Sequence, residues 1–341
     1  MAVVAVAGGP GAPGATTSAL ALLLAWPLHP GRRVLLAECD PDGGAVLAGA
    51  LEGRIDAVYG LRNLAVADRR GLLAQTIWEQ LIDLSPAGGG ERLLLPGLTD
   101  PAQAPGLAYT WEPLAEAFHA LEAQGYDVIV DLGRSGATGA GAVLARRADA
   151  VAVVVRTTLR GLSAARPRLA ALREDLEASG TGADALLLLP VAEGPYPAAE
   201  AARELRVEGL GGLPFAPRTA RVLSDGGDTA DRRFVRSELM RAARSSADAL
   251  QQLVARRRQR LAPQQPAPQP PVSAPPQAWQ PRTGPVLGPV QPRGPWAPAP
   301  EPHPLAFPPH IAPPAVPQPA APAPFPPPQQ HTGYGEVLRA R

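Results

Sequence analysis

The sequence contains no lysine, because all 32 residues counted as lysine plus arginine are arginine. Arginine carries a broad, forked guanidinium, whereas lysine presents a compact ammonium, so the two are not equivalent where a small cation must enter a tight site. Coding bias is enough to account for arginine on the surface. Chemistry that requires a compact ammonium group from this chain is nevertheless excluded.

Cysteine, net charge and long apolar runs are also scarce. The single cysteine, Cys39, excludes an intramolecular disulfide and a cysteine-built metal site. Residues 1–262 hold 28 arginines against 29 acidic residues, a balance that gives no general attraction to nucleic acid or anionic lipid. The apolar runs at 2–7 and 20–26 are too short for a membrane span, and the first lacks a basic leader. We therefore expect a cytoplasmic protein for which nucleic acid is not a specific ligand.

Proline is abundant but unevenly distributed. Of the 43 prolines, 27 lie between Pro263 and Pro328, in a stretch almost free of charge and of apolar periodicity, which cannot bury a core. We predict a folded domain over 1–262, a disordered proline-rich tail over 263–330 and a short terminal motif over 331–341. The Pro-x-x-Pro spacings of the tail favour polyproline II, which suits either docking to protein partners or a spacer.

Short aliphatic runs alternate with helical patterns along residues 1–262. The runs are mostly continuous rather than alternating, as expected for strands covered on both faces. Together they predict an α/β fold with a doubly wound, mainly parallel sheet. The predicted strands are Val3–Ala7, Val34–Ala37, Leu93–Leu95, Val128–Val130, Val151–Val155 and Leu186–Leu189. The predicted helices include 17–26, 114–124, 159–179 and 198–205, and a closing amphipathic helix is expected over 233–261.

The closing helix ends in the arginines Arg256, Arg257 and Arg258. Such a cluster can contact phosphate or acidic lipid, which makes peripheral membrane contact a hypothesis. Cations at a helix C-terminus are also favoured by the helix dipole without any ligand. The second explanation is the simpler one.

A glycine-rich turn follows the first predicted strand and opens a helix. It reads GGPGAPGATT over residues 8–17, and Gly9, Gly14 and Thr16 fit the Walker A pattern G-x-x-x-x-G-K-[ST]. Ala15 stands where the pattern has lysine. Two later strands end in carboxylates, in the segments LAECDPDGG (36–44) and YDVIVDLG (126–133). In open α/β sheets this edge is where ligands bind.

Together these segments resemble the ParA/MinD family of P-loop ATPases over most of residues 1–250. The resemblance implies an ATP and magnesium site with Gly9, Gly11, Gly14, Ala15, Thr16, Thr17 and Asp131 around the nucleotide. Arg134 is added to this set by its place just after Asp131, not by the resemblance. It implies that Thr16 and Asp131 hold the magnesium ion. It also implies that Asp40 orients the attacking water, with a weaker catalytic role for Glu38, which stands where the family usually has aspartate.

The departures from the family pattern concern catalysis. The two lysines that act in the family's phosphate loop are replaced by Pro10 and Ala15. Pro10 and Pro13 also lack the backbone N–H groups that such loops direct at phosphate oxygens. ATP binding is therefore doubtful, and we predict little or no ATPase activity. Arg134 is a candidate replacement cation.

The leading hypothesis is a non-hydrolysing or weakly nucleotide-binding positioning or scaffold protein for a cell-surface, secretion or pilus-assembly machine, similar to the TadZ/CpaE branch of the family. An active partitioning ATPase for chromosomes or plasmids, dimerising around nucleotide, is the first alternative. A proline-rich adaptor carried on an inert platform is the second.

Overall fold

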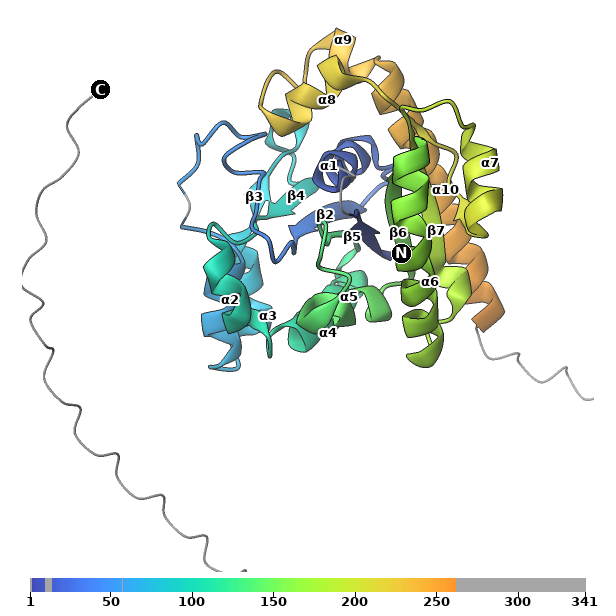
Figure 1. The fold of residues 1–341 in the computed structure, drawn as a ribbon. Coiled ribbons are helices and arrows are strands. Elements are labelled where there is room, and N and C mark those ends of the chain that lie inside the picture. The colour runs from blue at the N-terminus through green and yellow to red at the C-terminus, as the bar shows by residue number, and fades with distance from the viewer. Residues whose placement is uncertain (1, 10–13, 57, 262–341) are drawn as a thin grey trace, which may run out of the picture. The chain divides into compact units, whose positions relative to one another are not determined.

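The computed structural model describes residues 2–9, 14–56 and 58–261. Within them, strands and helices alternate around one nine-stranded sheet of order β3-β4-β2-β5-β1-β6-β7-β8, with β9 beside β7 (Figure 1). The described strand pairs are parallel except β3 with β4. The predicted α/β fold with a mainly parallel sheet is therefore confirmed. The predicted tail, the terminal motif and residues 10–13, which include Gly11, lie outside the described residues.

The six predicted strands are all present, each within a residue or a few of its predicted bounds. The sequence pattern did not identify the two-residue strands β3 and β8, which are too short to carry a periodic signal. The strands are β1 (Val3–Ala7), β2 (Arg33–Glu38), β3 (Ile82–Asp83), β4 (Arg92–Leu95), β5 (Tyr126–Asp131), β6 (Ala150–Arg156), β7 (Leu186–Ala192), β8 (Glu208–Gly209) and β9 (Leu213–Pro214).

The helices cover both faces of the sheet. The longer ones are α1 (Ala15–Ala25), α2 (Leu61–Asp68), α4 (Trp111–Ala120), α6 (Leu159–Ala178), α7 (Ala198–Leu205), α8 (Pro217–Ser224) and α10 (Glu238–Leu261). The shorter ones are α3 (Leu73–Thr76), α5 (Ala142–Arg147) and α9 (Arg232–Val235). One core cluster joins the sheet to α1, α8, α9 and α10, and the other joins it to α2 through α7 (Figure 1).

Strand β1 shows why aliphatic residues run without interruption. Val4 and Val6 lie in the cluster with α1, whereas Val3, Ala5 and Ala7 lie in the opposite cluster. Successive side chains of a strand point to opposite faces, so β1, which is covered on both faces, is apolar at each of these positions.

The predicted single helix over 233–261 is two helices. Helix α9 ends at Val235 and α10 begins at Glu238. The break is stabilised by Ser237, whose hydroxyl oxygen accepts a hydrogen bond from the Met240 N–H at 3.3 Å. A serine that accepts from the first turn is a helix start signal, and here it interrupts an otherwise helical pattern.

A buried carboxylate, Asp127, joins segments far apart in the sequence. It accepts hydrogen bonds from the Ala2 N–H and the Trp26 indole N–H, both at 2.9 Å, and from Arg32 at 2.7 Å. The Gln251 amide of α10 donates to the same carboxylate at 3.3 Å. The chain's first strand, the end of α1 and the last helix therefore meet at one side chain.

The arginines near the end of α10 bind the chain's own acceptors. Arg257 is 6% exposed, donates to the Asp149 carbonyl at 2.9 Å and pairs with Asp184 at 3.2 Å. Arg258 pairs with Glu122 and Asp149, each at 2.7 Å. Arg257 and Arg258 therefore attach α10 to the domain, whereas 60% of the Arg256 side chain is exposed, 4.0 Å from Glu208. Membrane contact through Arg256, Arg257 and Arg258 stays a prediction. Among the described helices, none has both the length and the apolar character needed to cross a membrane.

Candidate functional site

The carboxylates predicted for the site come from two neighbouring strands that end together. Glu38 of β2 lies beside Asp131 of β5 in the parallel register, and the Cys39 N–H donates to the Asp131 carbonyl at 2.7 Å. Asp40 follows two residues after Glu38. Because parallel strands share their carboxyl edge, Glu38, Asp40 and Asp131 are brought to one place, as the sequence predicts.

Gly133 connects this edge to the glycine-rich turn. Its φ of +56° is left-handed, and a Cβ at this residue would lie 1.7 Å from Asp40 Oδ2, so a larger residue does not fit. Its carbonyl accepts from the Gly8 N–H at 2.7 Å, and its own N–H donates to Asp131 Oδ1 at 3.0 Å. The ends of β1 and β5 are therefore tied together around Asp131.

Asp131 is a buried acid with an unsatisfied oxygen. The residue is 0% exposed, and Oδ2 has no hydrogen-bond partner within the described residues. Burial raises the pKa of Asp131 to about 7; the nearby Thr16 hydroxyl and the Gly133 N–H lower that pKa, and the charges of Glu38 and Asp40 raise it. A buried acceptor without a partner is costly unless a proton or a cation binds to it.

Glu38 is fully engaged by backbone donors. Its Oε1 accepts from the Ala45 and Val46 N–H groups at 2.6 and 3.0 Å, and its Oε2 accepts from the Gly97 N–H at 2.9 Å. Burial raises the pKa of Glu38, although these three hydrogen bonds lower it. The carboxylate thus holds the segment after β2 against the segment after β4, and this geometry favours a structural role over the weak catalytic role predicted for it.

Asp40 and Arg134 lie nearer the surface than Asp131. Asp40 is half-buried, and burial raises its pKa, while its hydrogen bond from the Asp42 N–H, at 2.9 Å from Oδ1, lowers it. The Arg134 guanidinium is 3.6 Å from Asp42 Oδ2, with 64% of its side chain exposed. The candidate replacement cation is therefore at the rim of the site, paired with a carboxylate of this chain.

The first turn of α1 faces the same edge of the sheet. Gly14, with a φ of +122°, precedes the helix, and Ala15 is its first residue, 4% exposed. Thr16 and Thr17 are half-buried on that first turn. The lysine position of the phosphate loop is therefore an inward-facing methyl group at a helix N-terminus.

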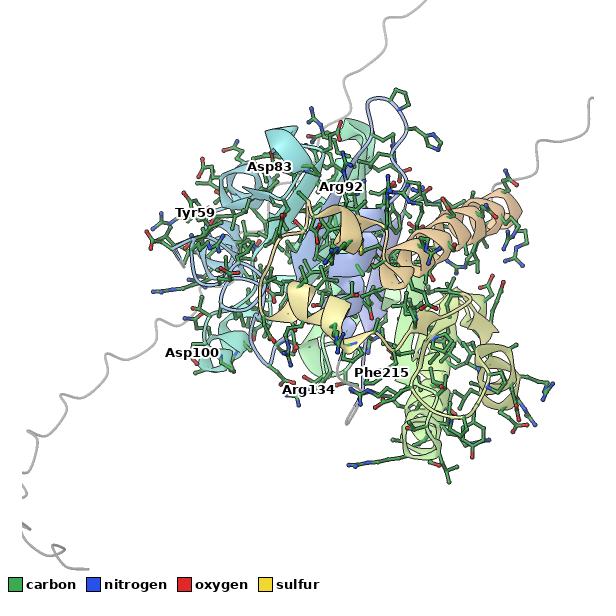
Figure 2. All side chains as sticks on the ribbon, turned by 90° about the horizontal axis from the view of Figure 1, so that it is seen from above. Tyr59, Asp83, Arg92, Asp100, Arg134 and Phe215 are labelled. Carbon is green, nitrogen blue, oxygen red and sulfur yellow. The ribbon has the colours of Figure 1, made fainter. Side chains whose placement is uncertain are left out.

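A second part of the site was not identified from the sequence. A cavity of about 400 Å³ extends from Gly14 and Thr17 to Arg156, at the end of β6, and to Phe215, just after β9. The Arg156 guanidinium lies 5.8 Å from the centroid of the Phe215 ring and pairs with Glu193 at 2.8 Å. Figure 2 labels Phe215 and Arg134 on the same side of the view, opposite to Arg92.

The cavity has the composition of a small-molecule site. Its walls are mainly apolar, with Val191, Pro214, Phe215 and Ala216 among the lining residues, and the charged residues Arg156, Arg221 and Asp225 also line it. Such mixtures of apolar surface and few polar groups are typical of ligand pockets. The sequence signal that could have indicated this cavity is the segment 213–217. Its aromatic residue, Phe215, stands between two prolines and lies outside any long apolar run.

Comparison with solved structures supports this description of the fold. No protein-family model and no curated protein matches this sequence. A ParA family ATPase from Chlorobium tepidum TLS aligns with a TM-score of 0.55 at 16% identity, over 72% of this chain and 98% of that one. The septum site-determining protein MinD from Pyrococcus horikoshii OT3, complexed with Mg-ADP, aligns with a TM-score of 0.53 at 17% identity, over 75% and 98%. A chain of the MinC:MinD cell division protein complex from Aquifex aeolicus aligns with a TM-score of 0.54 at 18% identity, over 73% of this chain and 96% of that one.

The sheet order, the strand-end carboxylates and the helix that follows the glycine-rich turn define a P-loop α/β fold. Within that class, the chain has the fold of the ParA and MinD ATPases. The predicted resemblance is therefore confirmed at the level of the fold. The roles of individual site residues remain predictions.

Proposed function

We propose that this chain binds an adenine nucleotide with magnesium, holds it without appreciable hydrolysis, and acts as a positioning or scaffold protein. The observation that carries this proposal is that the first turn of α1 borders both parts of the site. The Thr16 hydroxyl lies near Asp131, and Thr17 lines the same cavity as Phe215. A helix N-terminus favours phosphate, and the apolar cavity offers a place for a base. Binding of Mg-ADP by the similar MinD structure adds support.

Thr16 and Asp131 fit magnesium by their chemistry. Both present oxygen ligands, and Asp131 Oδ2 is a buried acceptor with no partner in the described residues. Those residues contain no group of three or more acidic, histidine or cysteine side chains able to hold a metal alone. Magnesium usually combines one or two protein ligands with phosphate oxygens, so we expect it to enter with the nucleotide and to neutralise phosphate charge.

Slow or absent turnover follows from the missing cations. Phosphoryl transfer depends on positive charge directed at the transferring group. Ala15 supplies none, the sequence has no lysine elsewhere, and Arg134 is paired with Asp42. A site with these residues can recognise a nucleotide, but its phosphate loop supplies no side-chain charge to accelerate hydrolysis.

A nucleotide that is held without turnover suits a protein that marks a position or supports an assembly. We propose protein partners from a cell-surface, secretion or pilus machine, with the proline-rich segment as one docking region and with self-association possible through the nucleotide face. The MinC:MinD complex illustrates that this fold can engage a partner protein.

Calorimetric titration of the protein with ATP, in the presence and in the absence of magnesium, tests the proposed function. We expect magnesium-dependent binding and no more phosphate release than in buffer. Thr16→Ala should weaken binding in magnesium by about tenfold or more, because a hydrogen bond or ligand to a charged group is lost. Thr229→Ala, on an exposed loop, is the matched control. Absence of binding, or rapid phosphate release, would contradict the proposal.

Restoring the lysine of the phosphate loop gives a second prediction. Ala15→Lys should strengthen binding of Mg-ATP by about 10- to 100-fold, because a hydrogen bond to a charged group contributes roughly 1.5–3 kcal/mol. Ala15→Met adds a chain of similar length without charge and is the control. Equal effects of the two substitutions would show that charge at this position is irrelevant to binding.

A further inference from the structure

Helix α6 sends one arginine toward the start of the glycine-rich turn. Arg168 Nη1 lies 3.4 Å from the position that a Cβ would occupy on Gly9. Its Nη2 donates a hydrogen bond to the Arg134 carbonyl. The guanidinium therefore lies between the end of β1 and the segment after β5, the two segments that enclose Asp131.

The side chain reaches this position along the surface of a cavity. A cavity of about 210 Å³ lies between α6 and the sheet, and it is lined by Gly8, Val153, Leu172 and the Arg168 stem. The neighbouring α6 residues Ala165 and Leu169 are buried against the sheet. Arginine commonly lays its apolar stem on such a surface while its charged end reaches out.

The charge of Arg168 is not matched by the acids around it. The carboxylate that lines the same cavity, Asp175, is bound by Arg146 at 2.9 Å. Arg168 is half-buried, and burial lowers its pKa, as expected for a cation that has lost water without gaining a counter-charge. A guanidinium has five N–H donors, and among the described residues only the Arg134 carbonyl accepts from this one.

Arg134, the cation suggested by the sequence, is less suitable. Its guanidinium is 64% exposed and pairs with Asp42, whereas Arg168 is held by its stem and by a backbone carbonyl. A planar, fixed guanidinium suits phosphate recognition, because it can donate two parallel hydrogen bonds. The hydrogen bond to the Arg134 carbonyl uses one of the five N–H donors of Arg168, so the remaining donors suit phosphate oxygens.

We propose that Arg168 binds the phosphate groups of the nucleotide from α6 and supplies the positive charge that the lysine-free loop lacks. The inference rests on the proposed function, since it assigns a ligand group within the same site. It predicts that Arg168 contributes to the binding of nucleotide phosphates and contributes nothing to the binding of the nucleoside.

The test compares three ligands on the full chain: Mg-ATP, Mg-ADP and adenosine. Arg168→Gln removes the charge and keeps the first part of the apolar stem, but its shorter side chain gives up the hydrogen bond from Nη2 to the Arg134 carbonyl. We expect it to weaken Mg-ATP and Mg-ADP roughly 10- to 100-fold and to leave adenosine within twofold. Arg168→Lys should recover part of the loss. Arg166→Ala, on the same helix and 3.9 Å from Glu204, should change none of the affinities.

The outcomes separate this inference from the proposed function. If the unsubstituted chain binds none of the three ligands, the proposed function fails and this inference fails with it. If it binds Mg-ATP and Arg168→Gln binds equally well, nucleotide binding stands and the role of Arg168 is refuted. A lowered melting temperature with unchanged affinity, or equal losses for adenosine and Mg-ATP, would show a tie between loops only.

Discussion

Asp127→Ala should lower the free energy of unfolding by about 3–5 kcal/mol, one of the two largest effects we expect. The substitution leaves the Trp26 indole N–H and the Ala2 N–H without their acceptor in a buried place, and it removes the partner of Arg32. Each unsatisfied buried donor costs roughly 1–3 kcal/mol, and loss of a buried charge partner adds to that cost.

Chemical denaturation of the full chain, monitored by far-UV circular dichroism, measures this effect. Asp127→Asn keeps the shape and one acceptor oxygen, so it should lose less stability than the alanine variant. Asp248→Ala, on the exposed side of α10, should change stability by less than about 0.5 kcal/mol. A loss below about 1 kcal/mol for Asp127→Ala would mean that water replaces the carboxylate in the buried cluster.

Asp131→Asn is expected to stabilise the nucleotide-free protein at alkaline pH. The folded chain keeps the Asp131 proton up to its raised pKa of about 7, whereas the unfolded chain releases it near the ordinary value of 3.8. The folded state thus binds more protons in that interval, so stability falls as pH rises from about 4 to 7 and is constant for this group above it. The penalty at pH 8 is on the order of 4 kcal/mol, and the asparagine variant should avoid most of it.

Unfolding measured in EDTA between pH 4 and pH 8 tests this expectation. The wild type should show a downward slope that is reduced in Asp131→Asn, with the two proteins closest near pH 4. Glu174→Gln, which removes an exposed carboxylate of α6, should leave the slope unchanged. An asparagine variant that is less stable than the wild type at pH 8 would contradict the raised pKa.

The sequence predicted those features that depend on continuous patterns. Aliphatic runs identified the strands that form the centre of the sheet, and strand-end carboxylates identified the edge at which Asp40 and Asp131 meet. Both are local signals with a direct physical cause, since strands buried on two faces are mostly apolar and parallel strands share an edge.

The features that sequence reasoning missed depend on contacts between distant segments. Arg156, Phe215 and Arg168 come from three different elements, and no spacing relates them. Glu38 was given a weak catalytic role because it precedes Asp40, but its buried carboxylate accepts three backbone N–H groups. Whether a strand-end acid faces a ligand or its own backbone is decided by loop conformation, which a pattern does not encode.

The meeting of Ala2 and Gln251 at Asp127 also bears on how the protein is synthesised. The native arrangement cannot be completed until α10 has left the ribosome, because its Gln251 amide and its arginines contact segments made much earlier.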